Sequence, residues 1–439
     1  MKKNSVAMMI LAVGLWFSSF AHAATTWSTQ DYDLYAGDFN GDGKTDILYI
    51  AKSSANASGI NLSDGTGPNI PLQIWPSNYL GIPWYGNQFK VILADFNGDG
   101  HTDILLQANT PGDSYLLLAN AQGMITGVSE AIPSTLAGLG WSADQHRLVA
   151  GDFNHDGRAD IFLQATAPSG TNAVFLAEAN GQFAAGDLSE QWADGYLGFN
   201  WATTEANVYA GDFNGDGYWD LLIQARPSWA LINYEVPFPV PTYPPNRNGV
   251  VFAQAAAPIF QASGIQSWSR TAFGADWSPL SSIIVVGDFS GGTRADVILE
   301  GSGSGKASDL LVGNASGAIF SNATPLASNV VWTADSYRLI AADFAGSGTA
   351  GVYLQAQSPS GTNYYALGIA GSSASVSTQT PPVPVNEMIT YSYDALGRLN
   401  AVSYSGAVNN NVQVSYSYDL AGNRTNAAAT GSPNATQPP

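Results

Sequence analysis

Aspartates recur at short, regular intervals in the segment AGDFNGDGKTDIL, residues 36–48. Asp38, Asp42 and Asp46 stand four residues apart, and Asn40 lies between the first two. Carboxylate and amide oxygens gathered in one tight loop could bind a hard cation. Paired carboxylates could instead serve as acid and base in catalysis. The way the segment repeats along the chain separates these interpretations.

The pattern occurs six times, in four intact and two degraded copies. Counted from the first aspartate, positions 1, 3, 5 and 9 of the intact copies carry a side-chain oxygen: Asp38, Asn40, Asp42 and Asp46; Asp95, Asn97, Asp99 and Asp103; Asp152, Asn154, Asp156 and Asp160; Asp212, Asn214, Asp216 and Asp220. Glycine at position 6 permits a sharp turn. Position 7 varies freely, as expected where only the backbone carbonyl is a ligand. Its residues are Lys44, His101, Arg158 and Tyr218.

Alternate residues of a tight loop point inward, so this spacing would bring several oxygens to one point. Three carboxylates held so close would repel one another unless a cation lay between them. The flexible oxygen shell of calcium fits this arrangement better than the strict octahedron of magnesium. We therefore predict about four Ca²⁺ ions, one in each intact loop. A turn without metal is the alternative for any single loop of this composition.

The degraded copies and the flanking residues limit this prediction. The fifth copy keeps Asp288, Ser290 and Asp296 but has Gly292 at position 5, so weak or no binding is expected there. The sixth copy keeps only Asp343, and no binding is expected. An EF-hand would need glutamate at position 12. The intact copies have residues of an apolar run at that position: Tyr49, Leu106, Leu163 and Ile223. The second flank is therefore predicted to be a strand rather than a helix.

A fixed period organises most of the chain. The lead aspartates are separated by 57, 57, 60, 76 and 55 residues, and the long step contains a proline-rich insert, residues 234–249. Short apolar segments between turn residues indicate four antiparallel strands in each unit, which is the size of one propeller blade. The sequence predicts an all-β β-propeller of about six four-stranded blades, with the aspartate loops between the first and second strands. A seventh blade from residues 227–268 and a linear β-solenoid are the alternatives.

Tryptophan marks the same frame, because one stands eleven residues before each lead aspartate. We expect these six side chains to pack between blades. They are Trp27, Trp84, Trp141, Trp201, Trp277 and Trp332.

The motif DFNGDGxxD at this period resembles the FG-GAP or VCBS repeats of integrin-α-type β-propellers, over residues 25–376. The resemblance implies a propeller with calcium loops, for which seven blades are common. Two further segments, YSYDALGRLNAVSY (391–404) and YSYDLAGNRT (416–425), resemble the YD repeats of Rhs and toxin-complex shell proteins. Two such units cannot enclose a cavity as the long shells do, so at most one or two hairpins are expected.

The expected division of the chain has five parts. A basic start, an apolar run and the small residues of SSFAHA indicate a secretory signal peptide, residues 1–23. The propeller would span 24–376, a proline-rich linker 377–387, and the two YD repeats 388–426. Residues 427–439 would form a disordered tail. Export to the periplasm or the cell exterior is therefore expected.

Composition excludes several classes of function. Removing Lys2 and Lys3 leaves 13 basic against 34 acidic residues, a net charge of −21. Phosphate contacts need clustered Lys and Arg, so we expect no nucleic-acid binding. No stretch after the leader reaches the roughly 20 apolar residues of a spanning helix, so no membrane insertion is expected. The absence of cysteine leaves no disulfides and no thiol nucleophile.

Catalytic residues are not indicated by the sequence. The histidines are scattered, and those at 101 and 155 lie inside the aspartate loops. Glu130, Asp144, Glu190 and Asp194 are acids without an assigned role, which leaves a polysaccharide-active enzyme as the least favoured hypothesis. The first hypothesis is a non-catalytic binding or adhesion module for a carbohydrate or protein partner. A structural docking component related to Rhs or toxin-complex shells is the alternative.

Candidate ligand contacts are placed on the face opposite the aspartate loops, because propellers usually bind near the axis at a loop face. Aromatic side chains there could stack on a sugar or contact a protein. The candidates are the tryptophans outside the six-fold repeat: Trp75, Trp192, Trp229 and Trp268.

Overall fold

The chain forms two compact units, and each is described by itself. The computed structural model describes residues 27–230, 240–242, 248–255, 257–303, 306–315, 318–326, 332–369, 377–379, 388–393, 399–405, 413–418 and 424–430. The first unit ends at Pro381, and the second begins at Pro382. The expected signal peptide lies outside the described residues. Within the described residues, no helix has the length and apolar character needed to cross a membrane.

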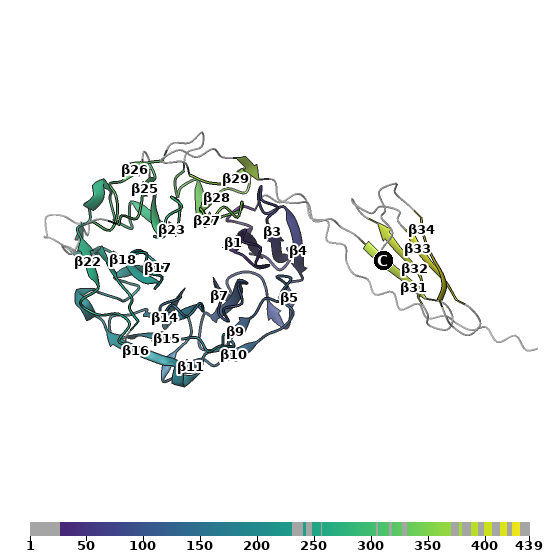
Figure 1. The fold of residues 1–439 in the computed structure, drawn as a ribbon, viewed down its shortest axis with the longest axis horizontal. Helices are drawn as coiled ribbons and strands as arrows, with labels where there is room; N and C mark the ends of the chain where they lie inside the picture. The colour runs from purple at the N-terminus through teal and green to yellow at the C-terminus, as the bar shows by residue number, and fades with distance from the viewer. Residues whose placement is uncertain are drawn as a thin grey trace, which may run out of the picture. The chain divides into compact units, whose positions relative to one another are not determined.

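The first unit is a ring of six four-stranded antiparallel sheets (Figure 1). The first blade has β1 (Tyr32–Gly37), β2 (Asp46–Ala51), β3 (Ser58–Leu62) and β4 (Ile70–Trp75). The second has β7 (Phe89–Ala94), β8 (Asp103–Ala108), β9 (Ser114–Leu117) and β10 (Glu130–Ile132). The third has β13 (His146–Gly151), β14 (Asp160–Ala165), β15 (Thr171–Phe175) and β16 (Leu188–Ala193).

The other three blades repeat this plan. The fourth has β17 (Ala206–Gly211), β18 (Asp220–Ala225), β21 (Asn248–Val251) and β22 (Ile265–Trp268). The fifth has β23 (Ser282–Gly287), β24 (Asp296–Gly301), β25 (Asp309–Leu311) and β26 (Thr324–Pro325). The sixth has β27 (Tyr337–Ala342), β28 (Gly351–Ala356), β29 (Asn363–Ala366) and β30 (Ser377–Gln379). First strands of successive blades contact one another, and β27 contacts β1, so the ring is closed.

Short elements lie in the loops between and within the blades. Three two-stranded hairpins pair β5 (Asn78–Tyr79) with β6 (Ile82–Pro83), β11 (Thr135–Leu136) with β12 (Leu139–Gly140), and β19 (Ser228–Ala230) with β20 (Val240–Thr242). Single 3₁₀ turns are η1 (Ala185–Asp187), η2 (Tyr196–Gly198) and η3 (Ala272–Gly274).

The prediction of an all-β propeller with six blades is confirmed, and the seven-blade alternative is wrong. Residues 227–268 supply no extra blade, because they contain the outer strands of the fourth blade and the β19–β20 hairpin. The sixth blade extends further than expected, since β30 pairs with β29 at the start of the predicted linker.

The second unit is a four-stranded antiparallel sheet with consecutive strands paired. Its strands are β31 (Met388–Tyr393), β32 (Leu399–Ser405), β33 (Gln413–Tyr418) and β34 (Arg424–Thr430). Three successive antiparallel pairings join these strands, which is one more than the two hairpins expected. The last strand extends four residues into the segment that was expected to be a tail.

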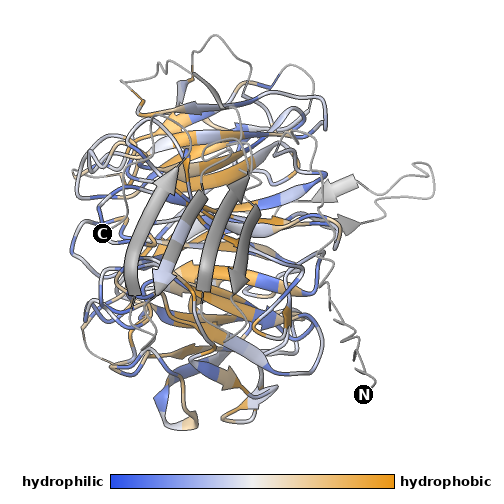
Figure 2. Cartoon of the chain, turned by 90° about the vertical axis from the view of Figure 1, so that its right-hand side faces the viewer, coloured by the Kyte–Doolittle hydropathy of each residue, from blue (hydrophilic) through white to orange (hydrophobic). Residues whose placement is uncertain are grey.

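The core lies between the blades. Every residue of the second strand is buried in all six blades, because this strand is central in its sheet and both its faces are covered. Figure 2 shows apolar residues concentrated in the strands and hydrophilic residues in the loops. The six repeated tryptophans are at most 5% exposed and pack between blades, as predicted. Trp201, for example, contacts Phe162 of the third blade and Val208 of the fourth.

Backbone hydrogen bonds between neighbouring aspartate loops close the ring. The N–H at position 8 of each loop donates to the carbonyl of the lead aspartate in the preceding blade, with N···O distances of 2.6–2.9 Å. The pairs are Thr102 with Asp38, Ala159 with Asp95, Trp219 with Asp152, Ala295 with Asp212, Ala350 with Asp288, and Thr45 with Asp343. The last pair joins the first blade to the sixth, so this series of bonds is continuous.

A buried glutamine forms a second connection between blades. It is the fifth residue of the second strand in four blades, and its Nε2 donates to backbone carbonyls of the next blade: Gln107, Gln164, Gln224 and Gln355. Gln107, for example, donates to the carbonyls of Trp141 and His146 at 3.1 and 2.6 Å. Such a bond satisfies carbonyls that would otherwise be buried without a partner.

At this position the first blade has Ile50 and the fifth blade has Glu300. The side chain of Glu300 is 1% exposed, and within the described residues its Oε1 accepts no hydrogen bond. Burial raises the pKa of Glu300 to about 8, although the Leu339 N–H and the Arg338 charge act in the opposite direction. The Oγ of Ser308 donates to the Trp332 carbonyl that a glutamine would otherwise reach.

We expect Glu300→Gln to stabilise the protein, increasingly so as the pH rises from 4.5 towards 8. In this window the native wild type retains a proton that the unfolded chain has lost, so its stability falls as the pH rises. Glutamine does not titrate, and its Nε2 could donate to the Tyr337 carbonyl. The gain at pH 8 should be about 1–3 kcal/mol in denaturant unfolding.

The reverse change, Gln164→Glu, is the matched control and should introduce the same loss of stability with rising pH. A pH-independent difference between wild type and Glu300→Gln would contradict the assigned role of Glu300.

Candidate functional site

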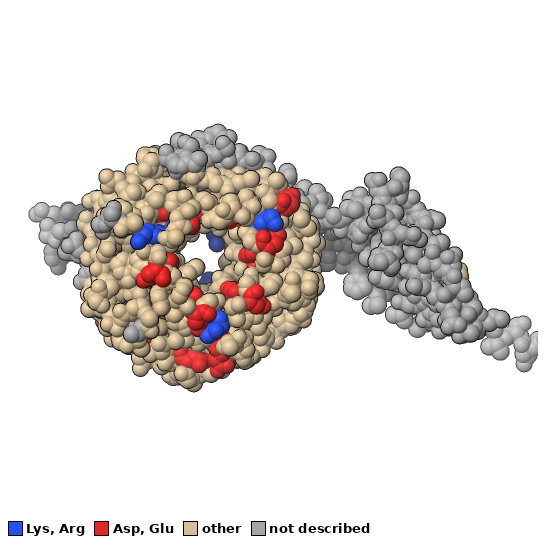
Figure 3. Space-filling view, viewed as in Figure 1, with Lys and Arg blue, Asp and Glu red and all other residues tan. Residues whose placement is uncertain are grey.

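The aspartate loops connect the first and second strands of each blade, as predicted. Because adjacent loops are bonded to one another, all six lie at one end of the ring. Figure 3 shows carboxylates gathered around the opening of the central channel, with a few basic side chains among them. We call this end the aspartate face.

Positions 1 and 3 of each intact loop bring two oxygens to one point. In the first loop, Oδ1 of Asp38 and Oδ1 of Asn40 both accept from the N–H of Asp42, at 3.2 and 3.3 Å. The other three intact loops repeat this convergence on the N–H of Asp99, Asp156 and Asp216. The predicted convergence of oxygens is therefore present for this pair of positions.

The carboxylate at position 5 has two partners of its own. Its Oδ1 accepts from the N–H at position 7, at 2.9 Å in each intact loop. In the first and third loops it also forms an ion pair with the side chain at position 7, Lys44 or Arg158. These side chains were not expected to take part. They place a positive charge beside the candidate cation position, whereas Tyr218 in the fourth loop does not.

The carboxylate at position 9 is buried under the loop. Oδ2 of Asp46 accepts from the Phe39 N–H at 3.0 Å, and its Oδ1 accepts from the Ser63 N–H at 2.8 Å. Asp103, Asp160 and Asp220 make the same two bonds in their blades. Each oxygen of a carboxylate has two lone pairs, so this role leaves acceptor capacity unused.

Burial raises the pKa of these position-9 carboxyls, and the acids at positions 1 and 5 raise it further, while the backbone N–H groups lower it. The resulting pKa is about 7 for Asp46, Asp103 and Asp160, and about 8 for Asp220. Burial is the largest cause of this rise, and the neighbouring carboxylates make a smaller contribution.

The described residues contain no cluster of three or more carboxylate or imidazole groups arranged to hold a metal ion. The loops nevertheless present only oxygen donors at positions 1, 3, 5 and 9, which is the ligand chemistry that calcium prefers. The donor set therefore fits a hard cation, and the residues that would hold it are those predicted from the sequence.

The lead aspartate has a role that needs no metal. In the degraded sixth loop, Asp343 accepts from the N–H groups of Ser347 and Gly348, at 3.1 and 2.7 Å. Asp288 makes comparable bonds to Gly291 and Gly292 in the fifth loop. This aspartate fixes the turn in intact and degraded copies alike.

Three of the four predicted ligand-face tryptophans are buried, so that prediction is wrong for them. Trp75, Trp192 and Trp268 are 1%, 6% and 6% exposed. Each packs against the repeated tryptophan of the next blade in a tilted or edge-to-face arrangement, with ring centroids 4.5–5.3 Å apart. They do repeat, at nine residues before that tryptophan, and this spacing could have revealed their packing role. The side chain of Trp229 lies outside the described residues.

Three acids without an assigned role accept hydrogen bonds from backbone N–H groups. Glu130 accepts from Phe183, Glu190 from Phe260 and Asp194 from Trp201. Burial raises the pKa of Glu190 to about 7. Their contacts explain them as structural residues.

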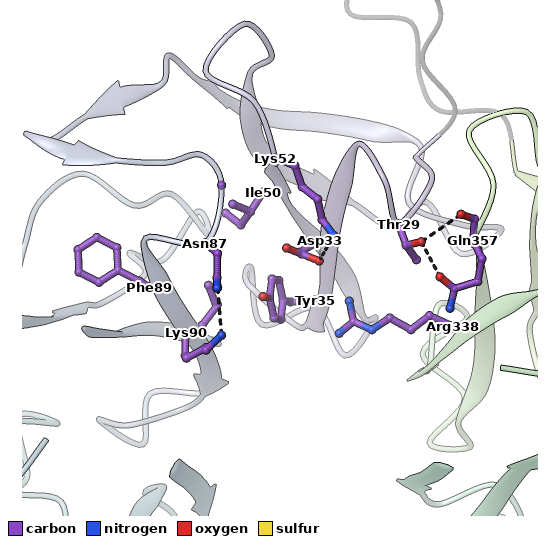
Figure 4. Close-up of a pocket in the computed structure, with 12 residues that line it drawn as sticks. Thr29, Asp33, Tyr35, Ile50, Lys52, Asn87, Phe89, Lys90, Arg338 and Gln357 are labelled. Atoms are coloured by element: carbon purple, nitrogen blue, oxygen red, sulfur yellow. Dashed lines mark hydrogen bonds and ion pairs between the residues drawn. The ribbon is translucent and has the colours of Figure 1, made fainter. Parts of the chain in front are cut away.

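A pocket of about 680 Å³ lies at the other end of the ring from the aspartate loops. It includes Asp33, Lys90 and Arg338, each the second residue of a first strand that ends at its aspartate loop. The remaining lining residues are Thr29, Tyr35, Ile50, Lys52, Gly86, Asn87, Phe89, Val91 and Gln357. Figure 4 shows these side chains coming from the sixth, first and second blades. We call this feature the axial pocket.

We expect Asp343→Ala to lower the free energy of unfolding by about 1 kcal/mol, equally in calcium and in chelator. The substitution removes hydrogen-bond acceptors of the turn without removing a metal site. Asp152→Ala is the matched change in an intact loop and should cost more in calcium than in chelator. A calcium-dependent effect of Asp343→Ala, measured by denaturant unfolding, would show that the sixth loop binds metal after all.

Comparison with known proteins supports the repeat assignment. A family model described as an FG-GAP-like repeat matches residues 38–106 and 95–163. Integrin alpha-PS5 of Drosophila melanogaster is 29% identical over 156 residues, which is 33% of this chain and 15% of the integrin. The match therefore spans only a small part of that relative.

Among solved structures, a lectin from Agrocybe aegerita, described as specifically recognising non-reducing terminal N-acetylglucosamine, aligns with a TM-score of 0.50. The identity is 17%, and the alignment covers 81% of each chain. The Tc holotoxin pore of Photorhabdus luminescens aligns with a TM-score of 0.47 at 16% identity, over 90% of this chain and 15% of that one. Residues 38–163 therefore carry FG-GAP-like repeats, and the unit that contains them is a six-bladed β-propeller.

Proposed function

We propose that the protein is an exported, calcium-stabilised binding module that recognises a carbohydrate or protein partner through the axial pocket. The pocket itself is the observation that carries the proposal. It is concave and combines a few polar groups with aromatic and aliphatic side chains, as small-ligand sites do. It also lies among the loops at the end of the ring opposite the aspartate face, and loops of a rigid scaffold commonly carry binding sites.

The lining chemistry supports binding rather than catalysis. Hydrolysis of a glycosidic bond generally needs two carboxylates flanking the bond. The residues lining the axial pocket include one carboxylate, Asp33, and its Oδ1 is 3.2 Å from Lys52 Nζ. The neighbour of this acid is thus a base, and the lining does not place a second carboxylate beside it.

Calcium is proposed for the four intact loops because their donors are all oxygens and because the acids at positions 1 and 5 lie close enough to the position-9 carboxyl to add to the rise that burial causes in its pKa. A bound Ca²⁺ would be held by positions 1, 3, 5 and 9 and by the carbonyl at position 7. It would neutralise the repulsion within the loop and hold the two flanking strands together. The ion is proposed to stabilise the ring and to take no part in ligand recognition.

We expect calorimetry to count about four Ca²⁺ ions per chain, and Asp42→Ala and Asp156→Ala to remove one each. At free calcium one hundredfold above Kd, each site adds about 2.7 kcal/mol to the free energy of unfolding. Chelation should therefore lower the melting temperature by many degrees. Asp216→Ala should remove the tightest site, because its loop has no basic residue at position 7. A melting temperature indifferent to chelator would contradict the calcium proposal.

Ligand binding can be tested on the purified full chain with a glycan array and a pull-down from an extracellular extract. We expect a specific ligand whose binding is weakened about tenfold by Asn87→Ala, a change in the exposed rim of the pocket. Asn180→Ala makes the same exchange on the aspartate face and should leave binding unchanged. Equal loss with both variants would place the ligand elsewhere, and no ligand in either assay would favour a docking role in a larger assembly.

A further inference from the structure

The axial pocket is basic although the chain is strongly acidic. The whole sequence has 15 Lys and Arg against 34 Asp and Glu. The pocket nevertheless contains three basic residues, Lys52, Lys90 and Arg338, and one acidic residue, Asp33. Arg147, at the second position of β13, occupies the place in the third blade that Lys90 has in the second. Positive charge therefore predominates in the lining of the axial pocket.

Two of the three cations in the pocket lack an acidic partner. Lys52 pairs with Asp33, but Lys90 Nζ donates only to the amide oxygen Oδ1 of Asn87, at 3.0 Å. The guanidinium of Arg338 lies over the ring of Tyr35, 5.6 Å from its centroid. Figure 4 shows Arg338 directed towards Tyr35. Within the described residues, neither Lys90 nor Arg338 forms an ion pair with a carboxylate.

The carboxyl group that acts electrostatically on Arg338 is Glu300, and it is buried. Its raised pKa keeps most of it protonated at neutral pH, so it does not balance the charge of the guanidinium. Attraction to the face of an aromatic ring favours this position of the guanidinium without using its N–H groups. This arrangement suits a planar anion such as a carboxylate, which arginine binds with two parallel hydrogen bonds.

The other groups that line the pocket are of the kinds that bind sugars. The Thr29 hydroxyl donates to Gln357 Oε1 but can still accept, and the side-chain amide of Asn87 can donate, which suits sugar hydroxyls. Phe89 supplies an aromatic surface next to them. A cavity of about 680 Å³ suits a short oligosaccharide. A protein partner would instead need an interface of roughly 800 Å² on each side.

We infer that the axial pocket binds an acidic oligosaccharide, with Lys90 and Arg338 contacting uronate carboxylates. This inference rests on the proposed binding function and names its ligand class. The carboxylates provide the anionic partners that the two cations lack in the protein. The hydroxyls of the sugar are bound by the amide and hydroxyl side chains of the rim.

The test is calorimetric titration of the full chain with trigalacturonate and with trimannuronate, each compared with its neutral methyl ester. We expect at least one uronate to bind about tenfold more tightly than its ester and to weaken as salt rises. Lys90→Gln and Arg338→Gln should each weaken that binding about tenfold. Arg338→Lys should retain part of it, because the charge remains while the planar fork is lost.

Lys306→Gln is the matched control, because it removes an exposed lysine that is not part of the pocket lining. It should leave uronate binding unchanged, and thermal melting should confirm that every variant is folded. Equal affinity for uronates and esters, no uronate binding at millimolar concentration, or insensitivity to both pocket variants would overturn the inference. Equally tight binding of a hexaglutamate peptide would overturn the choice of a sugar.

A neutral glycan found on the array, bound alike by wild type and by Lys90→Gln, would refute this inference and leave the binding function intact. The absence of any ligand in all assays would refute both.

Discussion

The fold depends on one repeated backbone hydrogen bond, from position 8 of each aspartate loop to the lead aspartate of the preceding blade. Because the sixth bond returns to the first blade, positions 1 and 8 of all six loops must lie at equivalent places along the ring axis. Close approach is part of this constraint, since a Cβ at Gly37 would lie 2.5 Å from Thr102 of the next blade. A loop that opened would break bonds to two neighbours at once. The closed ring therefore couples the stability of each loop to that of the others.

This constraint separates the roles of the acids within one loop. Position 1 holds the turn and position 9 connects the loop to the third strand through backbone N–H groups, as Asp46 does with Phe39 and Ser63. The side chains at positions 3 and 5 accept hydrogen bonds only from nearby N–H groups of the same loop. A bound cation would use them together with positions 1 and 9. The fifth loop retains Asp288 and Asp296 but has Gly292 at position 5. A degraded copy can thus lose cation ligands and still meet the geometric demand of the ring.

Much of the architecture was predictable because it depends on local, periodic signals. The period, the repeated tryptophans and the glycine at position 6 each report on one blade or one turn. The connections between blades were harder to predict. A glutamine near the end of the second strand has no local signal that predicts its burial. Its partners are backbone carbonyls of the next blade, as with Gln107 and Trp141. The burial of Trp75 by Trp84 likewise requires two blades in contact. Basic residues in the axial pocket come from three blades, so no single segment displays the cluster.

The aspartate face carries the repeated acids, whereas the axial pocket at the other end has three basic residues and one acid in its lining. Acids on the aspartate face are held at fixed positions by backbone bonds that the ring cannot lose, so they are poorly suited to adapt to a ligand. The second residue of each first strand takes no part in the bonds between aspartate loops. It differs from blade to blade: Asp33, Lys90, Arg147, Asn207, Ile283 and Arg338. This position can differ between blades because ring closure does not depend on its side chain. The end of the ring with free variation is therefore the end at which a specific binding site can form without disturbing closure.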